Sequence, residues 1–193
     1  MLINESGLVR AIKSAYKRGG YTVDNRGTEV AIYTESWYVK CLRATLPRKV
    51  MAAIVEHTGM IPELGAPVLI QKDMDPQLVM EDVARDETDH WRSGQHTDDV
   101  TMVPVIMQGY QIFQPQGGGE CWGVPFMSLE LIERDVAEHS SADVIDNSRL
   151  LWNGDSEAVV VAAVRKATSG WAKAWERAVW AALESVDLHK EEA

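Results

Sequence analysis

A cysteine beside a run of glycines is the first group in this sequence that could do chemistry. Cys121 follows three consecutive glycines in QPQGGGECWG, residues 114–123. A thiol becomes a nucleophile when a neighbouring base removes its proton. The histidines after Cys121, His139 and His189, fall in segments that we expect to be helical or terminal. Three histidines before it stay open as bases: His57, His90 and His96.

This stretch resembles the papain-like cysteine proteases, in which a glutamine and glycines precede a Cys-Trp pair. The resemblance implies that Cys121 is a catalytic nucleophile at the start of a long helix. Gly123 and Pro125 follow here instead, so we expect the helix to begin later. We therefore predict a protein that is not an enzyme, with Cys121 packed beside Trp122. A hydrolase that uses Cys121 is kept as the alternative.

Acidic and histidine side chains gather in the segment TDHWRSGQHTDD and just before it. This composition could hold a metal ion, but the two histidines are six positions apart and form no helical i, i+4 pair. We expect a solvated loop here, no metal and no cofactor. The residues concerned are Asp86, Asp89, His90, His96, Asp98 and Asp99.

Cations crowd the first part of the chain. Residues 1–50 hold nine basic and four acidic side chains, whereas the remainder holds ten basic and twenty-five acidic ones. On the helix expected over 6–18, three cations share one face at i, i+3 and i+7. Two more open the second expected helix, where cations oppose the helix dipole but favour an anion at the free N–H groups. We predict that these five residues contact nucleic acid: Arg10, Lys13, Lys17, Arg48 and Lys49.

The expected order of elements in this region is helix, three strands, helix. That order, with cations opening the last helix, resembles the double-stranded-RNA-binding domain and implies contact with duplex backbone. The lysine signature of that family is reduced here to Arg48-Lys49. The alternative is that these cations pair with the acidic part of the same molecule.

Trp180 belongs to the last helix expected, residues 170–186. Trp171 and Trp175 should face the core, and Trp180 lies nearly opposite, among charged residues. A tryptophan on a charged face is typical of a protein-interface anchor. Burial beneath another segment of the chain is the equal alternative.

The composition is that of a globular protein, with a net charge of −10, 46% hydrophobic residues and two cysteines. Two cysteines build no disulfide framework, and we predict a cytoplasmic protein without a signal peptide or membrane span. The fold class we predict is α+β: a basic αβββα lobe over 1–60, then an acidic region over 61–193. That region would open with a mixed strand segment and turn helical from Ser128 onward, unless both parts form one continuous domain.

Charge and size lead to a functional hypothesis. We expect a protein that binds a protein or nucleoprotein complex, with duplex nucleic acid a partner of the basic lobe. In size, acidity and lack of a catalytic set it resembles the anti-CRISPR inhibitors of phages and mobile elements. A structural or assembly protein that oligomerises through Trp180 is the third hypothesis, and the oligomeric state is left open.

Overall fold

One antiparallel sheet organises the molecule. The computed structural model describes residues 1–190, without the side chains of 81, 82, 86–88, 92 and 98. The described part forms an eleven-stranded sheet in the order β5-β4-β1-β2-β3-β11-β10-β9-β6-β7-β8. The strands are β1 Tyr21–Asn25, β2 Glu29–Tyr33, β3 Trp37–Leu42, β4 Val68–Ile70, β5 Gln77–Leu78, β6 His96–Met107, β7 Tyr110–Gln114, β8 Trp122–Pro125, β9 Ala142–Ile145, β10 Arg149–Asn153 and β11 Glu157–Ala162.

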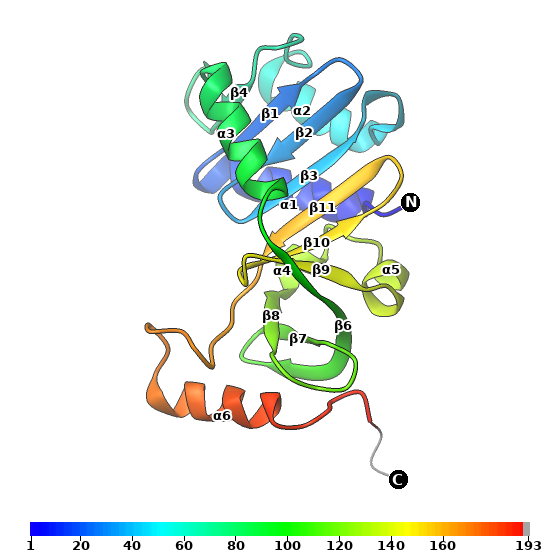
Figure 1. Ribbon diagram of the computed structural model, residues 1–193. Helices are drawn as coiled ribbons and strands as arrows, with labels where there is room; N and C mark the ends of the chain where they lie inside the picture. The colour runs from blue at the N-terminus through cyan, green and yellow to red at the C-terminus, as the bar shows by residue number, and fades with distance from the viewer. Residues whose placement is uncertain (191–193) are drawn as a thin grey trace.

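Short helices cover the sheet at its faces and ends (Figure 1). Figure 1 shows α3 in front of the first strands, α1 and α2 behind them, and α6 at the opposite end of the molecule. The helices are α1 Glu5–Arg18, α2 Arg48–Thr58, α3 Glu81–Arg92, α4 Phe126–Leu129, α5 Arg134–His139 and α6 Ala174–Glu184, with a 3-10 turn η1 Arg43–Thr45. None of the described helices is long and apolar enough to cross a bilayer.

Residues 1–60 adopt the predicted order of elements for local reasons. The Asn4 side chain accepts a hydrogen bond from the N–H of Gly7 and starts α1. In the β1–β2 turn, Gly27 takes a positive φ of 85°, and its N–H donates to the Asn25 side chain. Gly59, at φ 78°, ends α2 in the left-handed conformation.

The fold class predicted for the rest of the chain is wrong, because strands replace the expected helices. Residues 142–153 form the β9–β10 hairpin, whose turn places Asp146 and Asn147 at φ 47° and 55°, as a tight hairpin turn requires. The valine-rich segment 157–162 is β11, paired between β3 and β10. β-branched residues are typical of a strand that is covered on both faces. Such a strand is apolar at every position, so hydrophobic periodicity cannot distinguish it from a buried helix.

The two largest hydrophobic clusters lie on opposite faces of the sheet. The larger one lies between the sheet and α1–α2, and includes Leu8, Ile12 and Ile54 from the helices. A smaller cluster on the opposite face includes Tyr38, Val160 and Trp91, a residue of α3. Since β11 contributes to both clusters, it lies at the centre of the fold.

Candidate functional site: the cationic face of two helices

The five predicted nucleic-acid-binding residues lie on two helices that pack side by side. In α1, every 100° of rotation per residue puts Arg10, Lys13 and Lys17 within a stripe about 60° wide. This stripe is exposed, and Leu8 and Ile12 on the other side are buried in the core. In α2, Arg48 and Lys49 are exposed in the first turn, and Val50 is buried. The sequence pattern thus placed all five cations on the solvent side of one helical layer.

Three of the five cations form ion pairs within the chain. Arg10 Nε lies 3.1 Å from Glu130 Oε2, Lys13 Nζ lies 3.2 Å from Glu56 Oε2, and Lys49 Nζ lies 3.4 Å from Glu5 Oε2. Only Glu130 belongs to the acidic part of the chain. No ion pair to another described side chain is found for Lys17 or Arg48.

These ion pairs are solvent-exposed, which sets their strength. The side chains of Arg10, Lys13 and Lys49 are 61%, 48% and 71% exposed. Exposed pairs of this kind contribute about 0–1 kcal/mol and weaken with salt. A multivalent anion is therefore able to replace the carboxylates at little cost.

An internal carboxylate already meets the N-terminus of α2. Glu5 accepts a hydrogen bond of 3.0 Å from the backbone N–H of Lys49. That hydrogen bond, together with the Lys49 ammonium group, lowers the pKa of Glu5. The anion that we expected at the start of α2 is therefore the Glu5 carboxylate of α1. The two residues are 44 positions apart, and no local sequence pattern predicts such a contact.

Cys121 lies in a different region and is buried. Burial, followed by the nearby charge of Glu184, raises the pKa of its thiol to about 12. Its Sγ accepts a weak hydrogen bond of 3.5 Å from Gln114 Nε2, and no histidine is among its described hydrogen-bond partners. At neutral pH this thiol is protonated, so the geometry offers no activated nucleophile.

Trp180 is fully buried, as one of the two interpretations of the sequence required. It packs against β7 and β8, with its ring edge-on to Tyr110 at 6.4 Å, and belongs to a cluster with Ile112 and Cys121. Trp171 and Trp175, expected in the core, are 68% and 56% exposed. The predicted orientation of this helix is therefore wrong, and Trp180 has no surface to offer a partner.

The acidic segment 86–99 is helix α3 followed by the start of β6, which corrects the expected loop. The side chains of Asp86 and Asp98 lie outside the described ones. Asp99 and Asp143 face each other on β6 and β9, and their mutual hydrogen bond raises the pKa of Asp99. His96 Nδ1 lies 3.4 Å from Asp143 Oδ2. Among described residues, no group of three or more such side chains has a metal-binding arrangement.

A small cavity of about 260 Å³ opens on the α3 side of the sheet, beside Asp24, Arg26, Gly65, Pro67 and Arg85. The buried Asp24 carboxylate accepts a 2.6 Å hydrogen bond from Arg26 Nε. This volume lies below the roughly 300–1,000 Å³ of typical ligand pockets. The cationic face of α1 and α2 is consequently the better candidate site.

Comparison with known proteins adds no function. No family model and no curated protein matches the sequence. One solved structure that it matches is the beta chain of DNA polymerase III from Streptococcus pneumoniae, at 9% identity and a TM-score of 0.34. The match covers 92% of this chain and 67% of that chain. A similarity this low carries no argument about what the present chain does.

Proposed function

We propose that this chain is a cytoplasmic, non-enzymatic protein that binds a nucleic acid or a nucleoprotein complex through the exposed face of α1 and α2. One observation carries the proposal: these two helices hold six basic and two acidic residues in a chain whose net charge is −10. A local cationic surface on an acidic protein directs a polyanion to one face and repels it elsewhere.

The spacing of the cations supports contact with a phosphate backbone. Arg10, Lys13 and Lys17 span about 10 Å along α1. A strand of duplex DNA carries a phosphate about every 3.4 Å of its axis, so the three cations can reach several phosphates of one strand. Of the five predicted cations, Lys17 and Arg48 have no ion pair to a described side chain, so they are free to contact phosphates first. Binding of this kind recognises backbone and shape rather than base sequence.

A charge-matched pair of triple variants tests the proposal. Arg10→Glu/Lys17→Glu/Arg48→Glu reverses the proposed face. Arg134→Glu/Lys173→Glu/Lys190→Glu makes the same change in net charge at exposed cations away from α1 and α2. Binding to labelled duplex DNA and duplex RNA is measured by fluorescence anisotropy across a salt series. We expect the first variant to bind at least tenfold more weakly in about 50 mM salt, and the control to stay within about threefold of the wild type.

Two further results decide the matter. Glu5→Gln removes the carboxylate that competes for Lys49 and should strengthen binding. Absence of wild-type binding to either duplex at about 20 mM salt, or equal losses in both triple variants, would contradict the proposal. The narrower hypothesis of an anti-CRISPR inhibitor gains no support from the described residues or from the comparisons, and we do not extend the proposal to it.

A further inference from the structure

His57 lies where α1, α2 and β1 meet. Its imidazole ring stacks on the Tyr16 ring of α1, with the ring centres 3.9 Å apart and the ring planes 5° from parallel. Its Nδ1 lies 2.9 Å from the hydroxyl oxygen of Tyr21 in β1. The side chain is half-buried. Contacts from two other elements therefore hold this histidine in one orientation.

These contacts place His57 between the two helices of the cationic face. The helices run in the same direction, because an ion pair joins their first turns and the Tyr16–His57 stack joins their last turns. Lys13 of α1 pairs at 3.2 Å with Glu56, the residue before His57 in α2. A positive charge on His57 would thus lie beside Lys13 and add to the cations of this face.

The structure favours the neutral form of the His57 ring at pH 7.5. Tyr21 is 1% exposed, and burial raises the pKa of its hydroxyl, so this group stays protonated. Nδ1 of His57 is the acceptor described for that hydroxyl, so Nδ1 carries no proton and the ring N–H is on Nε2. Burial also lowers the pKa of His57 below its usual 6.5, and the charge of Lys13 lowers it further, against the opposing effect of Glu56.

We infer, on the basis of the proposed function, that His57 makes polyanion binding to this face stronger as the pH falls, because its imidazolium form adds a charge beside Lys13. The titratable groups that face the ring come from all three elements packed around it. They are Lys13 and Tyr16 of α1, Glu56 of α2 and Tyr21 of β1.

Protonation of His57 and binding of a polyanion favour each other. A phosphate that replaces Glu56 at Lys13 neutralises the lysine charge, which is one cause of the low pKa of His57. A bound polyanion therefore raises the pKa of His57, and by linkage a protonated His57 raises the affinity for the polyanion. For one added charge near a phosphate backbone, we expect a gain in affinity of about threefold between pH 7.5 and pH 5.5.

Fluorescence anisotropy with labelled duplex DNA and duplex RNA, at the two pH values and in about 100 mM salt, measures this gain. His57→Gln cannot take up a proton in this range, so it should bind as the wild type does at pH 7.5 and lose most of the gain at pH 5.5. His90→Gln is the matched control and should keep the full gain, because His90 is exposed on α3, on the opposite face of the sheet (Figure 1). Circular dichroism at both pH values confirms that the variants fold.

Nuclear magnetic resonance gives a second measurement, the pKa of the His57 ring in the free protein and in the complex. We expect a value below 6.5 in the free protein and a higher value in the complex. Tyr21→Phe removes the hydroxyl that donates to Nδ1 and should raise the pKa of His57 in the free protein. A merely structural role of His57 would leave its pKa the same with and without the duplex.

The outcomes separate this inference from the proposed function. Wild-type binding at pH 7.5 without a gain at pH 5.5, a gain that His57→Gln retains, or an unchanged His57 pKa in the complex would overturn the inference and leave the proposed function standing. Absence of duplex binding at both pH values would contradict the two together.

Discussion

Glu5 determines the electrostatics at the start of α2. Its carboxylate contacts both the backbone N–H and the ammonium group of Lys49, at 3.0 and 3.4 Å. Two cations in the first turn of a helix oppose its dipole, and a carboxylate at the same place offsets that effect. Lys49 therefore has a structural role in docking α1 to α2, besides the binding role that we propose for this face.

The lowered pKa of Glu5 makes this contact pH-dependent. A carboxyl group with a folded-state pKa below its usual 4.5 stabilises the fold above pH 4.5 and loses that effect as the pH falls through the lowered value. We expect Glu5→Gln to reduce the melting temperature at pH 7 and to match the wild type near pH 2, where both side chains are neutral.

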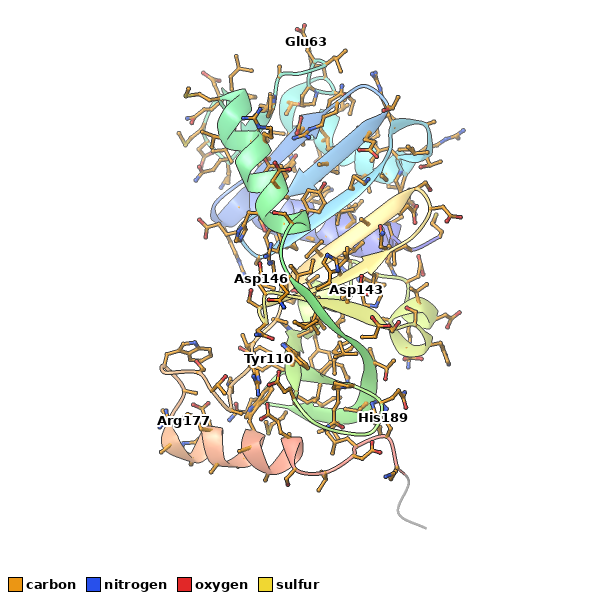
Figure 2. All side chains as sticks on the ribbon, in the orientation of Figure 1. Glu63, Tyr110, Asp143, Asp146, Arg177 and His189 are labelled. Carbon is orange, nitrogen blue, oxygen red and sulfur yellow. The ribbon has the colours of Figure 1, made fainter. Side chains whose placement is uncertain are left out.

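Thermal denaturation followed by circular dichroism at the two pH values measures this effect. Glu63→Gln serves as the control, because Glu63 is exposed and has no ion pair to a described cation (Figure 2). An equal loss for Glu5→Gln at both pH values would show that size or hydrogen bonding, and not charge, matters at this position.

At the scale of elements, α6 shows how packing partners set which face of a helix is buried. Glu176 and Glu184 form partly buried ion pairs with Lys166 and Arg165, and Trp180 packs against β7 and β8. Helical spacing in the sequence predicts that the charged residues face solvent, which is the opposite of the observed orientation. The packing partner that reverses it is Gly123, whose missing side chain leaves room for the Trp180 ring.

Gly123→Ala should therefore loosen α6. A methyl group at Gly123 would lie 2.5 Å from Cη2 of Trp180 and 3.0 Å from Cβ of Tyr110, and the Trp180 side chain is fully buried. Overpacking of this kind costs about 1–3 kcal/mol of unfolding free energy, which urea denaturation measures. Gly170→Ala is the control, because nothing lies within 4 Å of its added methyl group. Equal stability of both variants would mean that α6 shifts freely on the sheet.

At the scale of the whole molecule, the sheet runs across the boundary at residue 60. Strand β3 pairs along its length with β11, and the N-terminal segment is held by Glu157, whose carboxylate accepts hydrogen bonds from the N–H groups of Leu2 and Ile3. Gly7 of α1 also lies directly against the Glu130 carbonyl, where no methyl group would fit. Separating the two sequence regions would expose one edge of β3 and the largest core.

We expect the chain to unfold in a single cooperative transition. Tryptophan fluorescence and far-ultraviolet circular dichroism should give the same urea midpoint, because β11 shares its core with α1 and α2. Residues 1–60 expressed alone should lack a stable fold, since β3 loses its β11 partner. Two separated midpoints, or a folded 1–60 fragment, would show that the basic lobe is an independent domain.

The sequence by itself determined the first sixty residues well. Helical spacing, the Asn25–Gly27 turn and the glycine at the end of α2 are local patterns. The structures that they predict are held by hydrogen bonds and caps between nearby residues. The same spacing placed Arg10, Lys13 and Lys17 on one exposed face. These features depend on neighbours within about one turn, which a linear pattern contains.

Only the tertiary structure decided the rest. The segment 157–162 is a strand because β3 and β10 lie on either side of it, and Trp180 is buried because Gly123 receives it. The ion pairs Glu5–Lys49 and Glu176–Lys166 form only when folding brings separate elements together. A buried apolar run or a charged helix face has the same local pattern whichever segment covers it. Long-range packing, which excludes water from one side of an element, therefore decides between strand and helix and decides which helix face is buried.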